Sequence, residues 1–258
     1  MSKELATRPG WTVRAVNREL PSIAGLTRTD LVVGSPEFVR RAIEQLGVAS
    51  PSPPDYPAAL RPYLCRTVAT STLGEVAAAF EAAPTQALFV KPARDAKAFC
   101  GMLLSGADEA GMWLGMWLES FGAAFPVHTS TPINFIVEHR VFVVRGQVVG
   151  IGHYGRAAPE GCPPLDMAVV SAALAALQAA PEQDLAGCAI DFGVALQPDG
   201  SHVTALVECN DGVFTGFYDG VTPAHFVDMI LARWQQIMGT AATPAAAPSA
   251  SSGAAASQ

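Results

Sequence analysis

The sequence predicts a mixed fold of helices and antiparallel hairpins, and the α+β class itself is implied by a family resemblance described below. Two stretches rich in β-branched and aromatic residues each contain a tight turn, Arg145-Gly146 in the first and Asp199-Gly200 in the second. Such turns between apolar runs are typical of β-hairpins. Helices are indicated by cap residues, by prolines at first helical positions and by terminal glycines.

Each element follows from local chemistry. The hairpins span 133–155 and 188–208, and the other predicted elements are a strand at 31–33, helices at 36–47, 71–84, 165–180 and 222–239, and a strand at 87–91. Pro36 and Pro223 suit first helical positions, and Thr222 can cap the last helix. Ser71 or Thr72 can cap the helix that follows them.

The chain divides into three parts by composition. Residues 1–64 form a small N-terminal region with an expected α/β character, and they end in the proline-rich bridge ASPSPPDYPAALRP at 49–62. This bridge is predicted to be an extended linker. Residues 65–239 form the main domain, and the alanine, proline and serine tail at 240–258 is expected to be disordered because it cannot bury enough apolar surface to fold.

Composition and charge exclude several classes of protein. Of the 258 residues, 50% are hydrophobic and 15% are charged, and the net charge is −7. An acidic chain of this kind is not expected to bind nucleic acid through a general basic surface, although a local basic pocket could hold a phosphate. The longest weakly polar run, 168–180, is shorter than the ~20 residues that span a bilayer, so no membrane span is expected.

Cysteine usage and the first residues both favour the cytoplasm. The five cysteines are widely scattered without a C-x-x-C pair, which fits a reducing compartment better than a disulfide framework or a zinc site. The opening MSKELATRPGWTV has no apolar segment typical of a signal peptide.

The stretch ALVECNDG, at 205–212, turns an apolar strand into a polar one. Glu208 and Asn210 lie two residues apart and therefore share a face of the strand. Asp191 lies on the strand that pairs with it through the Asp199-Gly200 turn, near the same end of the hairpin. Three oxygen-bearing side chains could thus meet, and Mg²⁺ prefers oxygen ligands. The alternative is a strand that frays into a polar turn, since Asn, Asp and Gly favour turns.

Basic residues occur where a phosphate would need them. Lys91 ends a strand, Lys97 follows six residues later, and Arg140 lies on the first hairpin. Arg140 shares a face of its strand with Glu138. One of this pair could bind a ligand hydroxyl or amine and the other an anionic oxygen. The alternative for each of them is a solvated surface charge.

These motifs in this order resemble the ATP-grasp superfamily and, within it, the compact R-two-K clade. The motifs are FVKP-x4-K-x-F-x-G, FIVEHRVFVVRGQVVGIGHYG, AIDFGV and LVECNDGVFTGFYDG, followed by a closing helix with Arg-Trp. The resemblance covers about Cys65 to Met238. It implies an ATP-grasp fold, in which two α+β subdomains grip ATP, and an enzyme that joins a carboxylate to an amine through an acyl phosphate.

The resemblance also implies roles for individual residues. It assigns Lys91 and Lys97 to the nucleotide phosphates and the segment from Thr131 through Ile133 to Phe135 to the neighbourhood of adenine. Glu138 and Arg140 match the acidic and basic pair of the central hairpin. Asp191, Glu208 and Asn210 match the ligands of Mg²⁺, and Asp211 is expected behind them or on the substrate side.

Two departures from the family pattern leave alternatives open. Many ATP-grasp ligases have an arginine two residues before the first metal-binding acid, where this chain has Ala189, so Arg140 or Arg156 is expected to supply that charge in catalysis. The loop KPARDAKAFCG lacks a glycine-rich turn. A kinase-like phosphotransferase and a nucleotide-binding module without turnover therefore remain as rivals. The expected partners are a small-molecule or peptide carboxylate and an amine; their identity and the oligomeric state are not indicated.

Other aromatic and imidazole side chains receive no role as metal or nucleic-acid ligands. Trp113 and Trp117 are expected on one packed helical face, because no basic residues interleave with them. The five histidines lack metal-ligand spacing. His153 follows the first hairpin together with Tyr154 and Arg156, and it is the one histidine expected to face a substrate.

Overall fold

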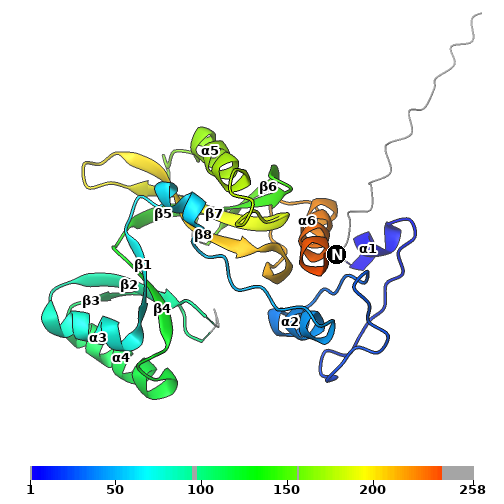
Figure 1. The fold of residues 1–258 in the computed structure, drawn as a ribbon. Helices are drawn as coiled ribbons and strands as arrows, with labels where there is room; N and C mark the ends of the chain where they lie inside the picture. Colours follow the sequence, from blue (N-terminus) through cyan, green and yellow to red (C-terminus); the bar gives the residue numbers. More distant parts are fainter. Residues whose placement is uncertain (1, 95–97, 156, 240–258) are drawn as a thin grey trace, which may run out of the picture.

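The computed structural model describes residues 2–94, 98–155 and 157–239. Within these residues the strands form two four-stranded antiparallel sheets, each with its own helices (Figure 1). The predicted α+β class is therefore confirmed. The two sheets, called the first and the second sheet in chain order, lie side by side, and residues 64–67 and 131–133 connect them.

The first sheet has the order β1-β4-β2-β3. Its elements are β1 (Val68–Thr72), α3 (Leu73–Ala82), β2 (Ala87–Pro92), β3 (Met102–Ser105), α4 (Ala107–Phe121) and β4 (Pro126–Ser130). Thr72 caps α3, as predicted, and Glu75 completes a capping box. The two helices pack on one face of this sheet, where Trp117 is buried and stacks on Phe99 with ring centroids 4.0 Å apart. The prediction that Trp113 and Trp117 belong to a packed helical face is confirmed.

The second sheet has the order β6-β5-β7-β8. Its strands are β5 (Asn134–Val144), β6 (Gln147–Tyr154), β7 (Gly187–Leu196) and β8 (His202–Asp211). Both predicted hairpins are confirmed, and Arg145, Gly146 and Gly200 adopt the positive φ that tight turns of this kind use. Helix α5 (Met167–Gln178) covers one face and α6 (Pro223–Met238) the other, so β7 is buried along almost its whole length.

The N-terminal region departs from its predicted α/β character. It contains α1 (Ser2–Thr7), α2 (Pro36–Gln45) and the 3-10 helix η1 (Ala58–Tyr63), and no strand is formed among described residues 2–64. The strand predicted at 31–33 is wrong. These residues pack in the apolar clusters built by α2 and α6, so burial alone accounts for their apolar character.

The proline-rich bridge is not a free linker. Its end forms η1, which packs against α5 and buries Leu60 completely. Upstream of η1, Asp55 makes an isolated antiparallel bridge with Cys209, the residue between Glu208 and Asn210 on β8. The proline-rich segment therefore runs along the edge of the second sheet at this point. The tail predicted at 240–258 lies outside the described residues.

Candidate functional site

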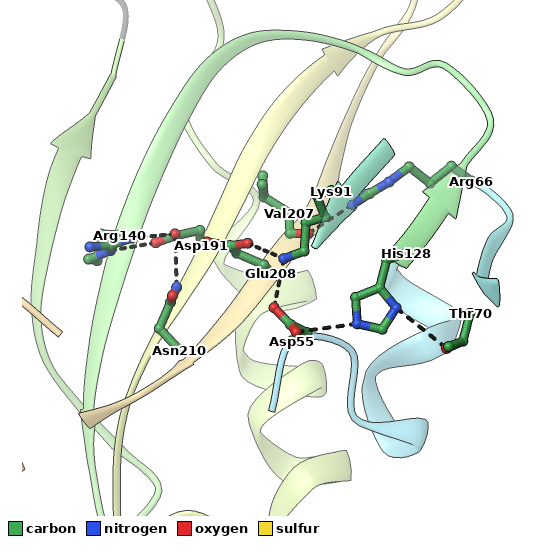
Figure 2. Close-up of polar contacts among 10 residues, drawn as sticks. All are labelled: Asp55, Arg66, Thr70, Lys91, His128, Arg140, Asp191, Val207, Glu208 and Asn210. Atoms are coloured by element: carbon green, nitrogen blue, oxygen red, sulfur yellow. Dashed lines mark hydrogen bonds and ion pairs between the residues drawn. The ribbon is translucent and has the colours of Figure 1, made fainter. Parts of the chain in front are cut away.

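A row of polar side chains crosses the first sheet. Thr70 on β1, His128 on β4 and Lys91 on β2 are directly opposed in the strand register. Directly opposed residues project to the same face of a sheet. The sheet thus presents a hydroxyl, an imidazole and an ammonium group in one line (Figure 2).

A second row crosses the second sheet in the same way. Arg140 on β5, Asp191 on β7 and Glu208 on β8 are directly opposed. The prediction that Asp191 and Glu208 lie at the same end of their hairpin is confirmed. A bulge follows Asp191, and such irregularities are common beside functional sites.

Lys91 joins the two rows. Its Nζ lies 2.7 Å from Oε2 of Glu208 and 2.6 Å from Oδ1 of Asp55. Burial by itself favours the neutral amine, but the carboxylates of Glu208 and Asp55 outweigh it and raise the pKa of Lys91 above its ordinary value. Lys91 is therefore a permanently charged ammonium group between two carboxylates (Figure 2).

Asp55 was not expected in the site. Its backbone oxygen accepts a hydrogen bond from the amide of Cys209 at 2.8 Å, which holds it beside β8. Its second carboxylate oxygen, Oδ2, lies 3.3 Å from Nε2 of His128. Burial favours the neutral acid, but the hydrogen bonds from His128 and Lys91 prevail and lower the pKa of Asp55. The carboxylate is therefore ionised at neutral pH.

Arg140 is fixed in position by hydrogen bonds and by aromatic rings. It donates two hydrogen bonds to Asp191, at 2.8 and 2.7 Å, and Asn210 donates a third to the same carboxylate at 3.1 Å. The guanidinium also lies 4.0 Å from the ring centroid of Tyr154 and 4.8 Å from that of Tyr218. A planar cation held in this way cannot rotate freely, so its orientation is set before any ligand arrives.

Glycines on β6 bring Tyr218 to Arg140. A Cβ atom at Gly152 would collide with the backbone oxygen of Asp219, and one at Gly150 would collide with that of Gly220. The loop that carries Tyr218 can therefore lie directly on the strand that carries Tyr154, and the two rings meet edge to face at 5.4 Å.

Glu138 shares a face of β5 with Arg140, as predicted. It is half-buried and lies two residues before Arg140 on this strand, beside the row on the second sheet. Burial raises the pKa of Glu138, and the negative charges of Asp191 and Glu208 raise it further. A carboxyl group with a raised pKa in a cluster of acids is a candidate for binding a ligand hydroxyl or amine.

The segment predicted to lie near adenine, Thr131 to Phe135, connects the first sheet to the second. Thr131 is exposed, Ile133 is half-buried, and the ring of Phe135 covers Gly193, where a Cβ atom would collide with it. Arg66 lies 5.5 Å from the centroid of this ring and donates hydrogen bonds to the carbonyls of Leu206 and Val207 at 2.6 and 2.8 Å. The segment therefore lies where the chain passes from the sheet of Lys91 to the sheet of Glu208.

The three predicted metal ligands converge, and their chemistry fits Mg²⁺. Asp191 and Glu208 are directly opposed, and Asn210 bonds to Asp191. Within the described residues no group of three or more His, Cys, Asp or Glu side chains could hold a metal ion. Mg²⁺ is commonly bound by one or two carboxylates together with substrate phosphates. Asp191 and Glu208, which contacts Lys91, match that mode of binding and do not form a closed protein cage, while Asn210 turns its amide nitrogen toward Asp191.

Three further predicted residues have different outcomes. Lys97 and Arg156 lie outside the described residues. Asp211 is buried at the end of β8, where its Oδ2 accepts hydrogen bonds from Nε and Nη2 of Arg233 at 2.9 and 2.7 Å and its Oδ1 accepts one from the amide of Val213 at 3.2 Å. Of the two positions expected for Asp211, the structure has the one behind the predicted ligands, because both of its oxygens hold α6 and η2 (Gly212–Phe214) in place.

The packing around Ala189 accounts for the absence of an arginine two residues before Asp191. Its side chain is fully buried against Phe142 and Met229 beneath α6. An arginine at this position would have to displace the helix, which would cost far more than a surface substitution. The guanidinium that reaches Asp191 is that of Arg140, from the neighbouring strand.

Sequence reasoning missed Asp55, Arg66 and His128. Asp55 stands in a proline-rich stretch, Arg66 between elements, and His128 without any ligand spacing around it. Their partners are far away in the sequence: His128 is 73 residues from Asp55, and Arg66 is 140 residues from Leu206. The single local signal was Asp55 itself, an acid placed directly before the aromatic Tyr56 in a segment that otherwise resembled a linker.

Comparison with known proteins places these observations in a family. A sequence model of the ATP-grasp domain, R-two-K clade family 2, matches residues 63–229, well over half of the chain. A search of curated proteins found no match. No helix of the described residues is both long enough and apolar enough to cross a membrane.

Solved structures were compared in the same way. The chain is similar to the ATP-grasp ligase PsnB complexed with a minimal precursor, at 16% identity and a TM-score of 0.43, and it covers 58% of that chain with 69% of its own. It is similar to the D-cycloserine synthetase DcsG, at 16% identity and 0.45, covering 69% of that chain with 70% of its own. It is also similar to the D-alanine-D-alanine ligase from Coxiella burnetii, at 12% identity and 0.44, covering 56% of that chain with 70% of its own.

Proposed function

The chain belongs to the ATP-grasp domain family, R-two-K clade family 2, and we propose that it is an ATP- and Mg²⁺-dependent ligase that joins a carboxylate to an amine. The observation that carries this proposal is the contact of Lys91 with Glu208, beside Asp191. An ammonium group next to two carboxylates provides one centre for phosphate oxygens and another for the cation that accompanies them.

In this proposal Lys91 binds the phosphates of ATP, and Asp191, Glu208 and Asn210 hold Mg²⁺. When bound, Mg²⁺ supplies positive charge that offsets the charge on the phosphate oxygens. Phe135 and the segment before it line the adenine side, and Glu138 binds a hydroxyl or amine of the ligand. Electrostatic positioning carries most of the rate enhancement, because phosphoryl transfer requires little covalent help from a protein.

The reaction has two steps. A carboxylate oxygen of the substrate attacks the terminal phosphorus of ATP, which forms an acyl phosphate and releases ADP. The amine nitrogen then attacks the acyl carbon, the C–O bond to phosphate breaks, and the nitrogen loses a proton as the C–N bond forms. Arg140 presents a fixed guanidinium at the edge of this site, where it can stabilise negative charge on the acyl oxygen.

A phosphotransferase is the second candidate, and Ala189 is the observation that favours it. The position where many family members have an arginine is closed by α6. A chain that lacks this charge can complete the first step and release a phosphorylated product. The remaining alternative, a nucleotide-binding module without turnover, is an outcome of the same test.

An ADP-release screen tests the proposal. The purified protein is mixed with ATP, Mg²⁺ and pairs of carboxylates and amines, both small molecules and peptides, and products are identified by mass spectrometry. A ligated product supports the ligase, and a stable phosphorylated carboxylate supports the phosphotransferase. ATP binding measured by calorimetry without ADP release for any pair supports the non-catalytic module. Lys91→Met is the matched inactive control.

The same proposal includes a location and partners. All five cysteines are free thiols within the described residues, and a reducing compartment such as the cytoplasm suits an ATP-dependent enzyme with exposed thiols. The partners are a small-molecule or peptide carboxylate and an amine. No role for nucleic acid or for a membrane is proposed.

A further inference from the structure

The ammonium group of Lys91 is engaged by groups of the protein itself. It carries three N–H bonds. One is directed to Asp55 at 2.6 Å and one to Glu208 at 2.7 Å, and Nζ also lies 4.9 Å from the ring centroid of Tyr56. Two of the three N–H bonds are thus directed to carboxylates of the protein and the Lys91 side chain is only 12% exposed, so a phosphate oxygen that approaches Nζ competes with these carboxylates.

Asp55 is the partner that can leave. Glu208 is the predicted metal ligand and stays beside the phosphates when they bind, whereas Asp55 has a second partner in His128 at 3.3 Å. Asp55 also has a positive φ of 36°, a conformation that non-glycine residues rarely adopt. Its position is held by the backbone contact with Cys209, so the side chain can turn away while the segment remains on β8.

We propose that Asp55 is an affinity-determining residue of the nucleotide site: its carboxylate occupies the position on Lys91 that a phosphate oxygen takes, and it yields Lys91 when the nucleotide binds. Asp55 lies before residues 63–229, which match the family, so the N-terminal region sets the affinity of a site that the main domain builds. This inference rests on the proposed function, because it requires Lys91 to bind a phosphate.

Two variants test the inference by isothermal titration calorimetry with ADP at a fixed Mg²⁺ concentration. Asp55→Asn keeps the shape of the side chain but removes the charge that competes with phosphate. Asp55→Gly removes the side chain and suits the positive φ. Both are expected to bind ADP about tenfold more tightly than the original chain, the factor that follows from losing one charge-assisted hydrogen bond at Lys91.

A matched control changes the same charge elsewhere. Asp108→Asn replaces an exposed carboxylate in the first turn of α4 and is expected to leave ADP affinity unchanged. Inorganic tripolyphosphate should show the same gain as ADP in the Asp55 variants, and adenosine should show none. A gain with adenosine would mean that Asp55 obstructs the base and not the phosphate, and it would overturn the inference.

The outcomes separate the two proposals. If the original chain binds ADP and neither variant binds it more tightly, the inference on Asp55 is wrong and the nucleotide site stands. If the variants bind ADP more weakly, Asp55 positions Lys91 and does not compete for it, which also overturns the inference. If neither the original chain nor any variant binds ADP or tripolyphosphate, both the inference and the proposed function fail.

Discussion

Replacing Arg233 with methionine should destabilise the fold strongly. Arg233 on α6 donates two hydrogen bonds to one oxygen of Asp211, and the Asp211 side chain is only 1% exposed. Methionine fills much of the same volume but leaves a buried carboxylate without its counter-charge. Removing one partner of such a pair typically costs about 3–5 kcal/mol.

The lower end of this range applies here. The other oxygen of Asp211 still accepts the hydrogen bond from the amide of Val213, so part of the charge stays solvated by the backbone. We therefore expect the free energy of unfolding to fall by about 3 kcal/mol. For a domain of this size, that corresponds to a drop in Tm of about 6–12 °C.

Urea denaturation followed by circular dichroism measures the effect, and a double-mutant cycle with Asp211→Asn isolates the pair. The double variant should recover part of the loss, because no unpaired charge remains. Arg18→Met, which removes one partner of an exposed pair, is the control and should leave the transition midpoint unchanged. A loss in the free energy of unfolding below about 1 kcal/mol for Arg233→Met would refute the reasoning, because losses that small are typical of solvent-exposed ion pairs.

Three further predictions concern the candidate site. Lys91→Met should lower ATP turnover about 100-fold, the loss usual for removing one donor at a developing negative charge, and steady-state ADP release would detect it; activity near the original level would contradict the assignment. Glu208→Gln should raise the Mg²⁺ concentration needed for half-maximal ADP release at least about tenfold, and an unchanged Mg²⁺ dependence would remove Glu208 from the proposed ligands. The raised pKa of Glu138 means that the folded state holds this proton more tightly than the unfolded state, so stability falls as pH rises above 4.5. Glu138→Gln should therefore have a higher Tm than the original chain at about pH 7 and an equal one at about pH 4, and equal values at both would contradict the direction of the shift.

The two hairpins and their turns were predictable because local chemistry determines them. The Asp199-Gly200 turn predicted that Asp191 and Glu208 lie near the same end of their hairpin, and they do. Their direct opposition depends on the bulge between Asp191 and Phe192, which the sequence pattern did not predict. First-position prolines and cap residues likewise predicted the starts of α2, α3 and α6, at Pro36, Leu73 and Pro223. In these cases the interacting residues are close in sequence, so turn and helix chemistry suffices.

The contacts between the two sheets could not be predicted from the sequence pattern. Lys91 and Glu208 are 117 residues apart, and Lys91 and Asp55 are 36 apart. No turn or periodicity relates these positions, and the packing of one sheet beside the other decides them. The failed strand at 31–33 has a related cause, because apolar residues there are buried by helices and not by a neighbouring strand.

A hinge movement between the two sheets would leave each row of the site intact and would separate one row from the other. Thr70 and His128 move as parts of one rigid pleated surface, and Arg140 and Asp191 as parts of another. The contacts of Lys91 with Glu208 and of His128 with Asp55 span from one surface to the other. Moving the two sheets apart would thus break the bonds to Glu208 on β8 and to Asp55 beside it. The geometry within each sheet would stay unchanged.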